Sequence, residues 1–543
     1  MLGNGSLAAM YEIRRVLPRE RLLGLGRRLF CAAWLAAAPL TVMCHAQSDT
    51  GGSVSGQVTD QSGLAASSAL VTIQNNATGV RNEVLCDAEG NFRFAELAPG
   101  TYTLLASARG FAVWEGDNIN VAVGTVRRVS ANLSLLAVHE TVLVDASSDH
   151  AETPSPAVTD NISQAQIEEL PNNGRHWSTF VLLTPGVTPD ANADGALSFR
   201  GMSVLLNNNT VDGADNNQAF FSQERGIIGN GYSIAQGAVR EFQVNTSNFS
   251  AEYGRAAGGV INTVTRTGTN QLHGHVFGFD RDAAWGAANS FTTLTTLTST
   301  AARETAVTRP YKPQDLRQQW GGSAGGPIRH DKLFWFFAYD QLRHNFPGVA
   351  VVGEPATFFE TPTVQQLQTL WARVRSSSTS AVTSCATKNS GDAALGAQCA
   401  YSTVLTDLNS LLGSVPRNAD QIILFPKLDW HPNDRNHLTF QYDRMRWSSP
   451  NGVETRPAET WGIASFGSSY TKVDAGVARW QYFVTPNLLN DARYQYGRDF
   501  EQQLSSAPTA FESRFAQNFY GRPPQISIAG SSSGLRFGKP ACK

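Results

Sequence analysis

Apolar and polar positions alternate with a period of two through much of the C-terminal half of the chain, as in β-strands with one apolar and one polar face. The runs predicted as strands are 271–281, 316–326, 332–343, 418–430, 437–447, 471–484 and 491–499. In two of these runs the apolar side consists of Leu438, Phe440, Tyr442, Ala492, Tyr494 and Tyr496, and the polar side of Thr439, Gln441, Asp443, Arg493 and Gln495. An apolar exterior around a polar interior is what a transmembrane barrel requires.

The connections between these runs alternate in length. The long ones are 282–315, 344–417 and 448–470, and the short ones lie near 327–331, 431–434 and 486–487. Outer-membrane barrels have long outside loops and short periplasmic turns, whereas a soluble sandwich has no reason to sort its loops in this way. The pattern therefore predicts an antiparallel transmembrane β-barrel over 271–543, with its long loops outside the cell.

Residues 1–46 have the pattern of a secretory signal peptide. A basic stretch precedes an apolar run at 29–43, and Cys44-His45-Ala46 places small residues at the cleavage-determining positions, so the mature chain is expected to begin at Gln47. The alternative is a membrane anchor, for which the run is short. Arg27-Arg28 leaves Sec and Tat export both open.

Between 51 and 137, short alternating runs are separated by turn residues about every ten positions, which predicts a β-sandwich. Its ordered motifs are Gly56-Gln57-Val58-Thr59-Asp60, Asp87-Ala88-Glu89-Gly90-Asn91-Phe92, Leu97-Ala98-Pro99-Gly100-Thr101-Tyr102 and Arg109-Gly110-Phe111. They resemble the carboxypeptidase regulatory-like domain. The resemblance implies a seven-stranded transthyretin-like sandwich of a carbohydrate-binding-like class, and no peptidase activity. Trp114 and Phe111 are the candidates for stacking on a sugar, with core packing as the alternative role of Phe111.

The segment 160–270 carries a second ordered set of motifs. They are Ile167 to Arg175, Thr184-Pro185-Gly186-Val187, Phe199-Arg200-Gly201, Asn209 to Asp215, Val239 to Val244, and Tyr253 to Thr265. In this order they resemble the α+β plug of TonB-dependent outer-membrane receptors of the Oar-like branch, whose members carry a regulatory-like domain in front of the plug. Within 271–543, Trp320 to Pro327 and His273-Gly274-His275 resemble barrel blocks of the same branch.

Eight plug positions are singled out: Arg200, Gly201, Asp212, Gly213, Gly254, Arg255, Gly258 and Gly259. Asp212-Gly213 is a hairpin-turn signal. Gly258-Gly259 before an alternating strand permits close backbone approach. Arg200 and Arg255 are expected to pair with carboxylates that point into the barrel, with contact to substrate as the alternative for Arg200.

The join at 138–160 contains Glu140, Thr141, Val142, Leu143 and Val144 before a polar stretch. These five residues resemble a TonB box, the segment that binds the TonB-type energising protein by adding a strand. The alternative is that they form the last strand of the sandwich.

The barrel is expected to be incomplete, because plugged transporters of this kind have about 22 strands and the chain ends at Lys543. Its last residues also lack the terminal aromatic strand that the family uses for assembly. We expect a truncated or frameshifted product, whose open strand edges lipid would penalise.

Composition fits this assignment. Only 16% of residues are charged, aromatic residues reach 10%, and the formal net charge of −2 gives no bulk attraction for nucleic acid. Beyond the signal peptide the cysteines are Cys86, Cys385, Cys399 and Cys542. Cys385 and Cys399 lie close together in a loop-like segment of an exported chain, which predicts a disulfide. No residue pattern indicates a catalytic set, a metal site or a cofactor.

The sequence thus predicts a mainly β protein of the cell outer membrane, with its sandwich in the periplasm. The resemblance implies energy-coupled uptake of a ligand such as an oligosaccharide or a siderophore. The implied partners are outer-membrane lipid, the TonB-type protein, the barrel assembly machinery and a small-molecule or glycan ligand. Two alternatives stay open: a surface adhesion or secretion-linked protein, and a non-functional fragment in which only the carbohydrate-binding-like sandwich folds.

Overall fold

The structure is a computed structural model, and its described residues lie within Ser48–Lys543. The described residues are 50–135, 142–145, 158–172, 175–190, 196–218, 224–225, 232–249, 253–290, 292–300, 303–360, 362–374, 384–385, 392–485, 488–515, 523–528 and 534–538. The predicted signal peptide, Glu140, Thr141 and Cys542 lie outside them.

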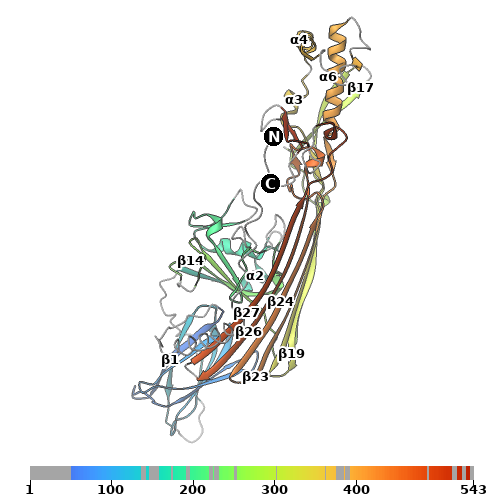
Figure 1. Cartoon of the computed structure of the whole chain (residues 1–543). Helices are drawn as coiled ribbons and strands as arrows, with labels where there is room; N and C mark the ends of the chain where they lie inside the picture. Colours follow the sequence, from blue (N-terminus) through green and yellow to red (C-terminus); the bar gives the residue numbers. More distant parts are fainter. Residues whose placement is uncertain are drawn as a thin grey trace, which may run out of the picture. The chain divides into compact units, whose positions relative to one another are not determined.

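The first segment is a sandwich of two sheets (Figure 1). One has the order β4-β1-β7, with β1 (Gly52–Asp60), β4 (Asn91–Leu97) and β7 (Val126–Leu133). The other has the order β3-β2-β5-β6-β8, with β2 (Leu70–Asn75), β3 (Arg81–Leu85), β5 (Gly100–Ser107), β6 (Trp114–Val121) and β8 (Val142–Asp145). Buried and more exposed residues alternate along β2, β5 and most of β4 and β7, as the pattern predicts, and the buried side chains form a separate apolar core.

Trp114 is a correction to the sequence analysis. Its side chain is only 5% exposed and belongs to the sandwich core, so it is not available to stack on a sugar. Phe111 packs against the same core, in agreement with its alternative role.

The second segment is the plug, an α+β unit built on one sheet with the order β13-β12-β15-β14-β9. Its elements are β9 (Val158–Ile162), α2 (Gln164–Glu169), β10 (Val187–Pro189), β11 (Leu197–Phe199), β12 (Asn208–Val211), β13 (Ala214–Asp215), β14 (Val239–Ser247), β15 (Val260–Thr265) and the 3₁₀ helices η3 (Trp177–Leu183), η4 (Val204–Leu206) and η5 (Gln236–Ala238). Ser163 and Gln166 form a capping box that starts α2. Every residue of the central strand β15 is buried, as in a strand covered on both faces.

The third segment contains a large antiparallel sheet, which we call the wall (Figure 1). Its strands, in both chain order and spatial order, are β16 (His273–Asp282), β19 (Leu316–Arg329), β20 (Leu333–Asn345), β23 (Asn418–Asn433), β24 (Asn436–Ser449), β26 (Ser468–Thr485) and β27 (Leu488–Leu504). These are the seven strands that alternation predicts, most of them extended by a few residues. Within the described residues the sheet is open, with β16 and β27 at its edges.

The two faces of the wall differ as predicted. Phe440 is 46% exposed and Tyr494 70%, whereas Gln441 on the opposite face is 9% exposed. Part of the plug-facing side is apolar, because Phe336, Phe425 and other wall residues share one core with the plug. The plug therefore packs on a mixed polar and apolar surface, and not on a purely polar one.

The long connections carry their own structure. Between β16 and β19 lie η6 (Ala283–Trp285), β17 (Thr293–Thr300) and β18 (Arg303–Pro310). Between β20 and β23 lie β21 (Gly348–Ala350), α3 (Pro355–Phe358), α4 (Val364–Val374), α6 (Ala393–Asn409) and β22 (Gly413–Val415). The remaining elements are β25 (Ala458–Glu459), η7 (Ile463–Ser465), η8 (Glu512–Arg514), β28 (Ile526–Ile528) and β29 (Leu535–Phe537). A disulfide joins Cys385 to Cys399, with their Cα atoms 5.7 Å apart. Among the described residues, no helix combines the length and hydropathy needed to cross a bilayer.

Candidate functional site

The candidate site is the interface between the plug and the wall, and its centre is the turn that joins β12 to β13. Val211 pairs with Ala214, so Asp212-Gly213 forms the two-residue turn that the sequence predicts. Both residues have positive φ, 48° at Asp212 and 70° at Gly213, as a type I′ turn requires. The turn presents the Asp212 carboxylate to the wall.

Asp212 forms a buried network with Lys427 of β23. Its Oδ1 accepts the backbone N–H of Thr265 at 3.0 Å, and the Nζ of Lys427 lies 3.5 Å from its Oδ2 and 2.8 Å from Oγ1 of Thr265. Burial alone would raise the pKa of Asp212, but the Lys427 charge and the Thr265 hydrogen bonds outweigh it and hold this pKa below its usual value. The carboxylate is therefore ionised and tied to the wall.

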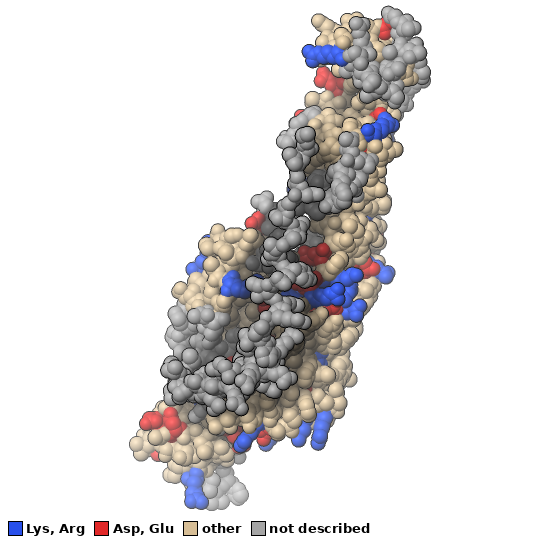
Figure 2. Space-filling model, in the orientation of Figure 1, with Lys and Arg blue, Asp and Glu red and all other residues tan. Residues whose placement is uncertain are grey.

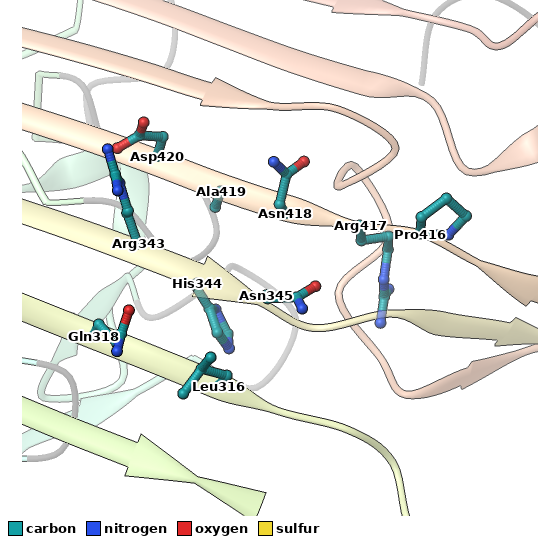
Figure 3. A pocket seen from close by; sticks show the side chains of 10 residues that line it. All are labelled: Leu316, Gln318, Arg343, His344, Asn345, Pro416, Arg417, Asn418, Ala419 and Asp420. Carbon is teal, nitrogen blue, oxygen red and sulfur yellow. The ribbon is translucent and has the colours of Figure 1, made fainter.

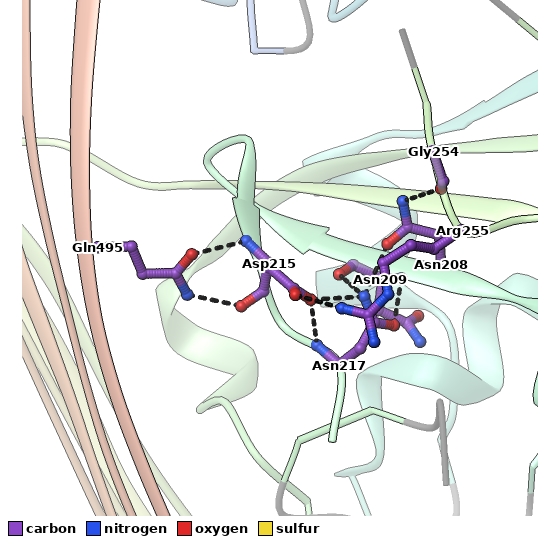
Figure 4. A network of polar contacts seen from close by, with 7 residues as sticks. All are labelled: Asn208, Asn209, Asp215, Asn217, Gly254, Arg255 and Gln495. Atoms are coloured by element: carbon purple, nitrogen blue, oxygen red, sulfur yellow. Dashed lines mark hydrogen bonds and ion pairs between the residues drawn. The ribbon is translucent and has the colours of Figure 1, made fainter. Parts of the chain in front are cut away.

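A second network, beside the first, ties the plug hairpin to β27 (Figure 4). The side-chain amide of Gln495 accepts a hydrogen bond from the N–H of Asp215 at 3.0 Å and donates one to its carbonyl at 2.6 Å. Arg493 donates to the carbonyl of Gly213. Arg493 and Gln495, two inward residues of β27, thus hold the hairpin through its backbone. These contacts depend little on the side chains of the hairpin.

The predicted role of Arg255 is wrong. Its Nη1 lies 2.6 Å from Oδ2 of Asp215, which belongs to the plug and not to the barrel. Asn217 completes the group by donating to Oδ1 of Asp215 at 2.6 Å and to Oδ1 of Asn208 at 2.7 Å (Figure 4). Arg255 therefore shapes the hairpin that the wall holds.

Arg200 also departs from its expected role. Its side chain is exposed, its φ is +51°, and within the described part of the chain it forms no ion pair with a barrel carboxylate. Among the described plug arginines, Arg225 forms an ion pair with such a carboxylate, 3.5 Å from Asp499 of β27. Sequence reasoning missed Arg225 because no motif marks it.

The plug glycines permit close approach where predicted. A Cβ at Gly259 would lie 2.3 Å from the ring of Phe199, and one at Gly258 would lie 2.5 Å from the Asn207 side chain. At Gly254 the space is open, so a side chain there would meet no neighbour. Gly254 contributes to the plug structure through its carbonyl, which accepts a hydrogen bond from the side chain of Asn208 at 2.9 Å.

A further plug–wall contact lies at Tyr232. Its hydroxyl donates to Oδ1 of Asp340 in β20 at 2.6 Å and accepts from Gln319 of β19. Nearby, Arg175 stacks 3.9 Å above the ring of Phe277 in β16. Plug residues therefore bind strands across the wall, from β16 to β27.

One buried carboxyl in the plug stands apart. Glu224 accepts from Nε1 of Trp177 at 3.0 Å and from the hydroxyl of Ser233. Burial raises the pKa of Glu224 to about 7 despite these hydrogen bonds. Unlike Asp212, Glu224 has no cation among its hydrogen-bond partners in the described part of the chain, so its charged form is disfavoured.

At the end of the wall where the long connections leave, a groove of about 540 Å³ lies over β19, β20 and β23 (Figure 3). Its lining includes the exposed Arg343 and Asn418 and the buried His344 and Arg417. Arg417 donates to the carbonyl of Phe346 at 2.9 Å and stacks on its ring, which fixes the base of the longest connection. Among the described residues, no group of His, Cys, Asp or Glu side chains is placed to hold a metal ion.

The candidate TonB box is partly visible. Val142–Asp145 runs parallel to β6, with Trp114 opposite Val142, at the edge of the sandwich sheet. This is the position that the alternative reading, a last sandwich strand, requires. An edge strand is also what strand addition needs, so the partner-binding role stays a prediction.

An apolar-faced antiparallel wall that holds a plug by its inward polar side chains defines the class of plugged outer-membrane barrels. The family described as an outer membrane beta barrel domain matches residues 264–541, and the carboxypeptidase regulatory-like domain matches 53–134. The chain belongs to this outer-membrane barrel family, and the protein resides in the outer membrane.

One relative is the TonB-dependent transporter Oar of Myxococcus xanthus, 30% identical over 302 residues, which are 54% of this chain and 26% of that protein. The chain thus spans about a quarter of the length of this relative. Among solved structures, the siderophore receptor PirA from Acinetobacter baumannii aligns with a TM-score of 0.36 at 14% identity, covering 69% of this chain and 42% of that one. The outer membrane transporter YddB from Escherichia coli aligns with a TM-score of 0.39 at 11% identity, covering 70% and 43%.

Proposed function

We propose that this chain acts in energy-coupled uptake of a ligand across the outer membrane, with a TonB-type protein as its energising partner. The observation that carries the proposal is the hairpin 211–215, whose turn is held by Lys427, Arg493 and Gln495 of the wall. These contacts hold the plug at one hairpin. A pull on the plug therefore has a defined set of contacts to break. The similarity to the Oar transporter supports the same function.

The segment Glu140 to Val144 is proposed to bind the energising partner. Its described residues, Val142 to Val144, are part of the extended strand β8 at a sheet edge. Strand addition depends on backbone N–H and C=O groups, so it tolerates changes of side chain better than loss of an N–H.

This difference gives a test. Leu143→Pro removes the N–H at the centre of the segment, whereas Leu143→Ala keeps it. Binding of the purified full chain to the periplasmic domain of a TonB-type protein should fall at least tenfold in Leu143→Pro and change little in Leu143→Ala. Equal binding by both variants would show that the segment is not the partner-binding strand.

The ligand is proposed to be an oligosaccharide or a siderophore, taken up from outside through the face that carries the long connections. Uptake of this ligand by cells should then depend on the contacts between plug and wall as well as on the segment Glu140 to Val144. Cells that carry Leu143→Pro should lose uptake, and cells that carry Leu143→Ala should keep it. Unchanged uptake in both would favour the adhesion or secretion-linked alternative.

A further inference from the structure

The outward face of the wall changes character along the strands. Starting from the short turns, its exposed side chains are apolar or aromatic: Leu428, Trp430, Phe440, Tyr442, Trp480, Val484, Tyr494 and Tyr496. Beyond this band, towards the long connections, outward positions of β24 and β26 carry charged residues, and Arg498 follows Tyr496 on β27. Leu424 of β23 and Phe500 of β27 flank these charges on the same face, so the charged part is a local patch.

Cations dominate the charged part. The backbone register aligns Arg444 of β24, Asp474 of β26 and Arg498 of β27 in one row. The next row contains Arg446, opposite Lys472. Four cations on three adjacent strands thus surround one carboxylate. Figure 2 shows Lys and Arg side chains about halfway along the wall, together with Asp and Glu.

The single carboxylate is already used. Arg446 binds both oxygens of Asp474 at 2.8 Å, and the hydroxyl of Tyr442 donates to Oδ1 at 2.5 Å. Arg444, Lys472 and Arg498 are exposed, and none of them forms an ion pair with any described residue. Neighbouring strands lie about 4.8 Å apart, so these three like charges crowd a patch on the order of 10 Å wide.

The height of the patch matches a membrane boundary. From Asn436 to Arg444 the strand rises about 27 Å at ~3.4 Å per residue. At the ~40° tilt of such strands this is about 20 Å along the membrane normal, close to the ~25 Å apolar band of outer-membrane barrels. Long Arg and Lys side chains reach further towards the polar layer.

We propose that Arg444, Lys472 and Arg498 bind the phosphate groups of lipid headgroups in the outer leaflet of the outer membrane. Guanidinium and ammonium groups are the side chains that recognise phosphate, and an anionic headgroup offsets the mutual repulsion of the three cations. The apolar band directly below them covers the acyl chains of the same lipid. This surface is a lipid-binding site independent of the plug and of transport.

The test uses the purified full chain in detergent micelles and a diphosphorylated glycolipid as the probe. The same glycolipid with its phosphates removed is the second probe. The wild-type chain should bind the phosphorylated form at least tenfold more tightly, and added salt should weaken this binding. Equal binding of the two forms would overturn the proposal, and this comparison does not depend on any variant.

A pair of triple variants locates the site. Arg444→Gln/Lys472→Gln/Arg498→Gln removes the three cations and should lose at least tenfold in binding of the phosphorylated lipid. Arg329→Gln/Lys332→Gln/Arg435→Gln removes three exposed cations at the short-turn end and should bind within about twofold of wild type. A loss as large in the second variant as in the first would contradict a site at the upper boundary.

Discussion

Lys427 of the wall and Asp212 of the plug form a buried ion pair across 215 residues of sequence, with Nζ 3.5 Å from Oδ2. The side chains of Lys427 and Asp212 are only 7% and 12% exposed. Because both charges are removed from water, each depends on the other and on Thr265 for compensation. This pair fixes the position of the Asp212-Gly213 turn of the plug against the wall.

Removing one member of the pair should loosen the plug. Lys427→Met leaves the Asp212 carboxylate buried without its cation, which is expected to cost about 3–5 kcal/mol of unfolding free energy. Urea titration of the full chain in micelles measures this. The double variant Lys427→Met/Asp212→Asn should recover part of the loss, and Lys332→Met, at an exposed turn, should show none. A Lys427→Met chain as stable as wild type would mean that the pair does not seat the plug.

The pH dependence of the unfolding free energy should show the titration of Glu224. Burial raises the pKa of Glu224 to about 7 from an ordinary value of 4.5, so the folded state holds a proton that the unfolded state has released. Stability should therefore fall as pH rises from about 4.5 to about 7, by about 3 kcal/mol in total, and then level off. Glu224→Gln should lower this slope, although burial also raises the pKa of Glu241 in the plug, whereas Glu169→Gln, at an exposed site of α2, should keep the slope unchanged. A Glu224→Gln profile with the wild-type slope would contradict the assignment.

Glycine substitutions test the close packing inside the plug. A Cβ at Gly259 would lie 2.3 Å from Phe199, so Gly259→Ala should destabilise the plug by about 1–3 kcal/mol. Gly254→Ala has open space and should be nearly neutral. Thermal unfolding of the two variants gives the comparison, and equal midpoints would argue against the packing described here.

The disulfide should matter only locally. Cys385 and Cys399 are 14 residues apart and join the helical part of the longest connection, where closing such a loop contributes about 3 kcal/mol. The double variant Cys385→Ala/Cys399→Ala should therefore be cut faster by protease between β20 and β23. The unfolding midpoint of the wall should not change. A lower midpoint for the whole sheet would show that the loop supports the wall as well.

The sequence predicted the wall strands and their two faces because alternation records burial directly, as Phe440 and Gln441 illustrate. It predicted the Asp212-Gly213 turn because the turn's backbone demands those residue types. It did not predict Lys427 as the partner of Asp212, because pairing across 215 residues depends on how the plug sits against the strands. The misassigned Arg255 has the same cause: nothing local separates a carboxylate of the plug from one of the barrel.

The wall is expected to cross the outer membrane with its long connections outside the cell. Two protease sites test it in cells that express the chain from its own gene. One is inserted at Gln365, on the exposed helix α4, and the other at Asp434, in the turn between β23 and β24. Protease should cleave at Gln365 in intact cells, and Asp434 should be protected until the outer membrane is opened. Equal cleavage at both sites in intact cells would contradict it, because β23 would then not span the membrane.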